Sequence, residues 1–438
     1  MNSLLNLCAD LNLSNRPTAF IDVNVISMNN DRILENQTVI IKNGLIDTIG
    51  NSRHTPVPSD AIPIKSGKKY LLPGLVDMHV HFNSFAPFFG VKNEWALYIS
   101  NGVTTVRNMW GIHIGWYHPF LNKCKKIPMC NIPIPNVYTG GQILESKPQF
   151  FPPLSKLIEN PNNARKFVEY EKKKGYEFIK IYHTLSEDSY MAISKAAKEL
   201  SIPFLGHVPD VIGIDGAIKA GQHSIEHLIG FFNPFTGKTK TDIESVGQYG
   251  ANLRDAGVWN CPTMVVWQRY LSPDKANEFD KKSDMRYLQK KYRYSMQKAL
   301  TAASSKLIIP DNYDDYQKHV VGELHKAGAR ILLGTDSPNP YIVPGFSAHE
   351  ELENLVEAGL TPFEAIKAGT KNAAECLNRL DEFGTISVGK RADLLLLDKN
   401  PLNDIKNLKS MSGVMVRGTW LPKSALDAIL NAIEKSCI

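Results

Sequence analysis

The sequence predicts an α/β protein, in which a (β/α)8 TIM barrel carries a small β-sandwich built from both ends of the chain. Residues 18–70 and 383–422 consist of short strand patterns separated by turn signals such as NND and KNG. The long stretch between them alternates short apolar strands with helical patterns, which indicates βα units and a parallel sheet. A chain of 438 residues has room for one large domain and a smaller companion.

These sequence patterns divide the chain into three parts. Residues 1–70 are expected to form the N-terminal part of the sandwich, residues 71–382 the barrel, and residues 383–438 the C-terminal part of the sandwich with a terminal helix. The stretch from about 267 to 330 is too long for one connection and has a basic, helical pattern, so we interpret it as a helical insertion. A lid over the barrel and an extra pair of surface helices are both consistent with this pattern.

The middle of the chain contains eight candidate strands, the number that a closed barrel of this type requires. They are residues 75–82, 103–109, 136–140, 178–185, 202–208, 223–227, 258–266 and 331–337. Helical patterns follow most of them. After the fourth strand, Ser186 is a good N-cap, and Glu187 and Asp188 occupy the first turn, where the helix dipole favours acidic side chains.

Composition excludes several classes of function. The net charge is +6, but the lysines are scattered and no basic motif for nucleic acid occurs. No apolar stretch approaches the roughly 20 residues needed to cross a bilayer, and the first residues lack the pattern of a signal peptide. The six cysteines show no C-x-x-C spacing. We therefore expect a cytoplasmic protein, or one exported after removal of a signal, that binds neither nucleic acid nor membrane.

Polar side chains stand at the ends of the predicted barrel strands. His79 and His81 are two residues apart in GLVDMHVHF, so they project from the same face of a strand. Later strands end in His207, His227 and Asp336. For each residue alone, a hydrogen-bonded core histidine or a helix-capping aspartate is the ordinary alternative. Because barrel active sites form at the carboxyl ends of the strands, the five together favour a metal site of nitrogen and oxygen ligands.

Lys180 lies inside an apolar strand, in FIKIY. A charged lysine inside a barrel is costly unless it is paired or its pKa shifts. One alternative is a side chain that reaches solvent or a salt bridge. The other is a neutral amine that reacts with carbon dioxide to give a carbamate, an anion able to bridge two metal ions.

With these residues the chain resembles the metal-dependent amidohydrolase superfamily, from about residue 18 to 423. The matching motifs are GLVDMHVH, FIKIY, GHV, SIEH, GTDS and the C-terminal GTISVGKRADLLLLD. The most similar subgroup carries a carboxylated lysine on strand four and includes prolidase-like dipeptidases, Xaa-Arg or Xaa-Lys carboxypeptidases and ochratoxin-degrading amidases. Residues 335–377 also resemble imidazolonepropionase-like proteins.

The resemblance implies a binuclear centre of two divalent metal ions, with zinc as the default. The implied ligands are His79, His81, Lys180, His207, His227 and Asp336. The first two histidines and the aspartate would bind the more buried ion, the other two histidines the second ion, and carboxylated Lys180 both. A hydroxide would lie between the ions, and Asp336 would take its proton and pass it to the leaving nitrogen as general base and acid.

The implied function is hydrolysis of an amide bond in a dipeptide or an N-acyl amino acid. The alternative is hydrolysis of a cyclic amide or lactone by the same centre, as in imidazolonepropionase-like proteins. Lys180 and the GHVPD motif argue against a mononuclear deaminase, which generally lacks the bridging lysine and has His-x-x-Glu on strand five. A non-catalytic barrel in an assembly is a remote alternative, because all the expected ligands are present.

Four further residues are candidates near this centre. Tyr182 shares its parity with Lys180 and is expected to face inward. His113, beyond the second strand, is either a surface histidine or a group that polarises the substrate carbonyl. Arg107 either binds a substrate carboxylate or pairs within the barrel, and Asp77 is expected to orient a metal-binding histidine. The expected partner is a small-molecule or dipeptide substrate, and assembly into a homo-oligomer is left open.

Overall fold

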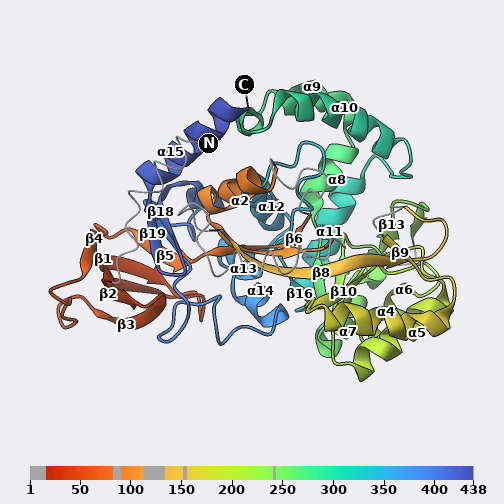
Figure 1. Ribbon diagram of the computed structural model, residues 1–438, viewed down its shortest axis with the longest axis horizontal. Helices are drawn as coiled ribbons and strands as arrows, with labels where there is room; N and C mark the ends of the chain where they lie inside the picture. The colour runs from red at the N-terminus through yellow and green to blue at the C-terminus, as the bar shows by residue number, and fades with distance from the viewer. Residues whose placement is uncertain (1–15, 82–89, 112–133, 151–154, 240–242, 438) are drawn as a thin grey trace.

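The computed structural model describes residues 16–437, except 82–89, 112–133, 151–154 and 240–242 (Figure 1). Its larger sheet is built from parallel strands that follow one another in chain order. They are β6 (Leu75–Val80), β7 (Val103–Asn108), β8 (Asn136–Glu145), β10 (Phe178–Ile181), β11 (Phe204–Gly206), β12 (Ser224–Glu226), β15 (Trp259–Cys261) and β16 (Arg330–Ile331). Strand β9 (Ser155–Leu157) pairs with β8 outside this order. This sheet and the second one described below confirm the predicted fold class.

The barrel closes between its first strand and the segment that follows its last strand. Strand β16 is short, but the chain runs on alongside β6. The N–H of Met78 donates to the carbonyl of Leu333 at 2.8 Å, and the N–H of His81 donates to that of Ser337 at 2.6 Å. The carboxyl ends of the first and last strands are thereby held side by side.

Helices alternate with the barrel strands, as the sequence pattern predicts (Figure 1). They include α2 (Gly90–Ser100), α4 (Ala164–Lys173), α5 (Glu187–Glu199), α6 (Gly213–Ala220), α7 (Val246–Ala256), α11 (Tyr313–Lys326), α12 (Phe346–Glu357), α13 (Pro362–Ala368) and α14 (Lys371–Cys376). The predicted N-cap of α5 is confirmed, since the Ser186 hydroxyl accepts the N–H of Ser189 at 3.3 Å.

The second sheet joins both ends of the chain. Its strands are β1 (Thr18–Ile26), β2 (Ile33–Lys42), β3 (Leu45–Asn51), β4 (Ile62–Lys65), β5 (Tyr70–Pro73), β17 (Leu394–Leu397), β18 (Met411–Val416) and β19 (Thr419–Pro422). The two ends meet where β5 pairs antiparallel with β17. Apolar side chains from both ends, such as Phe20, Leu71, Leu394 and Met415, share one buried cluster.

The predicted strand over residues 258–266 is too long. The strand ends at Cys261, and helix α8 (Met264–Tyr270) begins three residues later. Pro262 has no N–H for the ladder, and Thr263 has a φ of 52°, which turns the chain out of the strand. The apolar residues after Thr263 are buried as the first turn of a helix rather than as a strand.

The chain between β15 and β16 forms α8, the short helix α9 (Ala276–Asp280) and the longer α10 (Lys290–Ser304) before α11. Figure 1 places α9 and α10 at the same edge of the molecule as the C-terminal helix α15 (Lys423–Ser436). Met296 and Leu300 of α10 belong to one buried cluster with Ile429 and Ile433 of α15. These helices therefore pack together as one layer.

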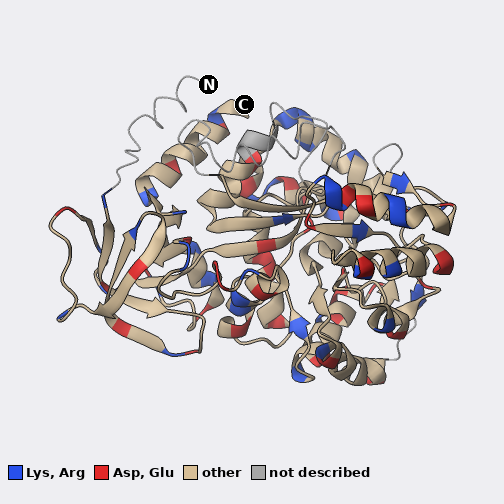
Figure 2. Ribbon diagram, turned by 60° about the horizontal axis from the view of Figure 1, so that its bottom comes forward, with Lys and Arg blue, Asp and Glu red and all other residues tan. Residues whose placement is uncertain are grey.

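Charged side chains of both signs are interspersed along the described helices (Figure 2). Among the described residues, we find no helix that is both long and apolar enough to cross a membrane.

Candidate functional site

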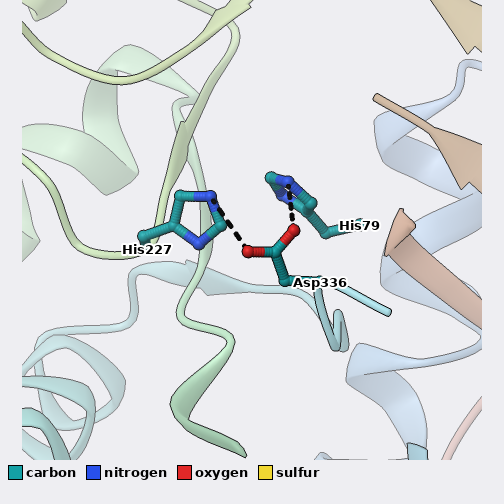
Figure 3. A group of neighbouring side chains, drawn as sticks. All are labelled: His79, His227 and Asp336. Atoms are coloured by element: carbon teal, nitrogen blue, oxygen red, sulfur yellow. Dashed lines mark ion pairs between the residues drawn. The ribbon is translucent and has the colours of Figure 1, made fainter. Parts of the chain in front are cut away.

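The residues predicted at the strand ends come together at the carboxyl face of the barrel. His79 and His227 have ring centroids 4.4 Å apart, and those of His207 and His227 are 5.0 Å apart. Asp336 lies between the histidines (Figure 3). Its Oδ1 is 2.8 Å from Nε2 of His81, and its Oδ2 is 4.0 Å from Nε2 of His227.

Two of these residues have unusual backbone conformations. Both His227 and Asp336 have positive φ, of 62° and 60°. Non-glycine residues avoid this region, and such strain is found most often at functional sites. Hydrogen bonds hold both in place: the N–H of His227 donates to the carbonyl of Cys261 at 2.8 Å, and that of Asp336 to the carbonyl of His79 at 2.7 Å.

The side chains fit a metal centre. One ligand atom each of His79, His227 and Asp336 lies within 4.8 Å of the others, and all three residues are buried. Among the described residues, Nε2 of His79 and Nζ of Lys180 are buried without a hydrogen-bond partner. A buried polar group without a partner is costly. Imidazole nitrogen and carboxylate oxygen are ligands for zinc and for related divalent ions.

Electrostatics favour the metal-binding forms of these groups. Burial, and next the charge of Lys180, lowers the pKa of His207 well below its ordinary value, and burial is also the main cause for His79 and His227. The imidazoles are therefore neutral at pH 7, as metal ligands must be. Burial also lowers the pKa of Lys180 to about 8.

The Asp336 carboxyl responds to two opposing effects. Burial raises its pKa, but the charges of His227, His81 and Lys180, together with the hydrogen bond to His81, lower it by more. The net result is a pKa below the usual value of an aspartate. Asp336 is therefore ionised at neutral pH.

Glu226 was not predicted from the sequence, but it contacts the site directly. Its Oε2 is 2.6 Å from Nδ1 of His79, and its Oε1 accepts from Arg107 at 2.8 Å and from Ser224 at 2.5 Å. The sequence signal that could have found it is a carboxylate inside a buried strand, on the same face of that strand as Ser224. His227, one residue later, also reaches the site because its positive φ ends the strand and cancels the alternation.

Arg107 takes the second of its two predicted roles. It is 1% exposed, and it donates to the Met78 carbonyl at 2.6 Å as well as to Glu226. Among the described residues, Asp77 makes no hydrogen bond or ion pair with a histidine ring. Its carboxylate accepts the N–H of His79 at 3.2 Å and the Thr335 hydroxyl at 2.6 Å, so it ties the first strand to the segment before Asp336.

Tyr182 and its neighbour both border the centre. The Tyr182 ring lies 4.2 Å from that of His207, centroid to centroid, and it lines the cavity above the site. Nδ1 of His183 is 3.2 Å from Nδ1 of His207. His113 lies outside the described residues.

A cavity of about 590 Å³ opens above the histidines and Asp336. This volume lies within the range of small-molecule sites. Aromatic side chains from several elements line the cavity: Trp110, Phe150, Tyr182, Phe235, Trp267, Tyr270 and Tyr292. The α10 segment also contributes to the wall, so the inserted helices border the site.

Comparisons with known proteins agree with this architecture. A family model described as "Amidohydrolase family" matches residues 70–421. An ochratoxinase from Aspergillus niger is 24% identical over 435 aligned residues, which cover 85% of this chain and 79% of that protein. A 5-methylthioadenosine/S-adenosylhomocysteine deaminase from Caldanaerobacter subterraneus is 24% identical over 421 residues, covering 88% and 86%.

The same fold occurs in a solved structure, that of a bottromycin amidohydrolase. It superposes with a TM-score of 0.77 over 100% of this chain and 93% of the other, at 23% identity. At this identity the likeness establishes the fold.

Proposed function

This chain belongs to the amidohydrolase family and is a hydrolase that acts on C–N bonds, and from this premise we propose that it cleaves the amide bond of a dipeptide or an N-acyl amino acid. The observation that carries the proposal is the position of Asp336. An ionised carboxylate lies among neutral histidines at the base of an apolar cavity, within reach of a bound substrate.

The proposed cofactors are two divalent metal ions, with zinc as the default. His79, His81 and Asp336 would hold one ion, His207 and His227 the other, and carboxylated Lys180 both. Two such ions, when bound, lower the pKa of water and polarise the scissile carbonyl. Nε2 of His79 and Nζ of Lys180, which are buried without a hydrogen-bond partner, support this assignment.

Lys180 is proposed to be carboxylated. The lone pair of its neutral amine attacks carbon dioxide, a nitrogen–carbon bond forms, and one proton leaves to solvent, which gives a carbamate with one negative charge. A pKa of about 8 leaves a useful fraction of the amine neutral near pH 7. The carbamate would also replace a buried amine that lacks a hydrogen-bond partner by a group whose oxygens could bind metal ions.

Asp336 is proposed to carry the proton. It accepts a proton from the attacking water as the oxygen–carbon bond forms, and it delivers that proton to the nitrogen as the carbon–nitrogen bond breaks. Its low pKa keeps it available as the base, and its Oδ1 lies 2.8 Å from Nε2 of His81.

Glu226 and Arg107 are positioning residues in this scheme. The Glu226 carboxylate, held by Arg107, accepts a hydrogen bond from Nδ1–H of His79, which leaves Nε2 of that ring without a proton and facing the centre. In this scheme, the buried ion pair between Glu226 and Arg107 favours the tautomer of His79 that carries its proton on Nδ1.

Hydrolysis of a cyclic amide or lactone is the second candidate, favoured by the resemblance of residues 335–377 to imidazolonepropionase-like proteins. A single screen of dipeptides, N-acyl amino acids and lactones separates it from the leading proposal. Metal analysis and intact-mass measurement of protein purified without chelator should give about two ions per chain and the mass of one bound CO2. One ion and no added mass would overturn the binuclear proposal.

A further inference from the structure

Three aromatic side chains of the cavity lining, Phe150, Tyr182 and Phe235, form a cluster that we call the aromatic wall. The ring centroid of Phe150 lies 5.5 Å from that of Phe235 and 5.6 Å from that of Tyr182. The centroids of Tyr182 and Phe235 are 6.1 Å apart. Phe150 is 38% exposed, although it lines the cavity. An exposed aromatic surface inside a concave site is stabilised when an apolar ligand group covers it.

This wall is held in a fixed geometry. Phe235 lies on the turn after Asn233, whose amide donates to Asp210 at 2.9 Å, and the Thr236 hydroxyl donates to the same carboxylate at 2.8 Å. The Phe235 ring stacks on His183 with centroids 4.2 Å apart and an interplanar angle of 9°. The turn that carries Phe235 is therefore anchored, and the three rings of the wall are inclined at 52–74° to one another.

Helix α10 forms another part of the cavity wall and is fixed near both ends. The Tyr292 hydroxyl donates to the Pro338 carbonyl at 3.0 Å, and the Ser304 hydroxyl donates to the Tyr270 carbonyl at 3.0 Å. Small side chains of α10, at Ala299, Ala302 and Ala303, line the cavity between these anchors. The helix thus borders the space without filling it.

Lys306 follows α10 and lines the same cavity. Its side chain is exposed and makes no ion pair with any residue that the structure describes. Two residues later, the N–H of Ile308 donates to the carbonyl of Pro234 at 2.7 Å. This bond joins the Lys306 segment to the turn that carries Phe235, and both Lys306 and Phe235 line the cavity.

Building on the proposed amide hydrolysis, we infer that the substrate carries an aromatic ring and a carboxylate on the same side of the scissile bond. The ring packs against Phe150 and Phe235, and the carboxylate pairs with Lys306. An N-acylated aromatic amino acid has this arrangement. Lys306 is then a specificity-determining residue, supplied by the inserted helices rather than by the barrel strands.

Binding to the Asp336→Asn protein loaded with metal tests this inference without turnover. Calorimetry would compare N-acetyl-L-phenylalanine, its carboxamide and N-acetylglycine. Lys306→Gln should weaken binding of the acid by about tenfold, because a charge-assisted contact is lost, and should leave the carboxamide unchanged. Phe235→Leu should weaken both phenyl compounds and leave N-acetylglycine unchanged.

Two variants serve as controls. Lys306→Arg keeps the charge and should bind the acid almost as the parent does. Lys298→Gln removes an exposed lysine of α10 that is not part of the cavity lining, and it should change nothing. The inference is overturned if Lys306→Gln affects acid and carboxamide equally, if it affects neither, or if the parent protein does not bind N-acetyl-L-phenylalanine.

Failure of the proposed function has a different signature. In that case the parent enzyme would hydrolyse none of the N-acyl amino acids, while the binding preferences for ring and carboxylate would remain as described.

Discussion

Glu226 and His79 form a hydrogen-bonded pair 2.6 Å long in which neither side chain is exposed to solvent. The pair connects the site to the barrel interior, because the other carboxylate oxygen is held by Arg107. A carboxylate that orients a metal-binding histidine contributes to both metal affinity and protein stability.

Glu226→Gln should therefore weaken metal binding by about 10- to 100-fold. It should also destabilise the metal-free protein by about 3–5 kcal/mol, since the buried Arg107 loses its partner. Chelator competition and thermal unfolding measure the two effects. The control Glu375→Gln removes an exposed carboxylate and should match the wild type in both. Unchanged metal affinity would show that Glu226 does not position His79.

Asp336→Asn should lower kcat by about 10²- to 10⁴-fold, the usual contribution of a general acid–base group. The amide keeps the shape and one oxygen ligand, so metal should remain bound when measured by elemental analysis. The exposed Asp311→Asn provides the matched control. If the variant retains full turnover, the proton carrier is another group.

Lys180→Met replaces the amine by an apolar side chain of similar length that cannot react with carbon dioxide. We expect the bound metal to fall to about one ion per chain and the added mass of CO2 to disappear from the intact-mass spectrum. Thermal stability of the metal-free protein should be equal or higher, since a buried amine without a hydrogen-bond partner is removed. Retention of two ions would exclude a bridging role.

His349 makes stability depend on pH. Burial lowers its pKa from 6.5 to about 4, and its Nε2 lies 3.0 Å from the Asn101 carbonyl. Between these two pKa values the unfolded chain binds the proton and the folded chain does not, so folding stability falls as the pH drops from 6.5 towards 4. This pKa shift lowers the free energy of unfolding at acid pH by about 3 kcal/mol at most.

His349→Gln should flatten this dependence. Melting temperatures of the metal-free wild type and variant, compared across that pH range, isolate the effect because the histidines proposed as metal ligands are common to both. Parallel curves for the two proteins would contradict the assignment.

The strand-end residues were predictable from the sequence because two simple rules apply to them. Side chains alternate along a strand, and barrel sites form at the carboxyl ends. These rules led to His79, His81, His207 and Asp336 without knowledge of the packing, and the fold class followed from the alternation of strand and helix patterns.

The rules fail where a contact depends on distant residues. The role of Glu226 requires Arg107 to cross the barrel interior from another strand. Asp77 shares the parity of His79, yet Thr335 captures its carboxylate. The position of Lys306 depends on a hydrogen bond between segments more than 70 residues apart, Pro234 and Ile308, and no local pattern encodes it.

The pairing of β5 with β17 has a consequence for synthesis of the chain. Leu72 of β5 pairs with Leu395 of β17. The N-terminal strands are therefore synthesised long before the strand that completes their sheet. Such distant pairing slows folding. Until then β5 presents an open edge, and a chain truncated before β17 would keep that edge permanently exposed and prone to aggregation. The small sheet can therefore be completed only after β17 has been synthesised.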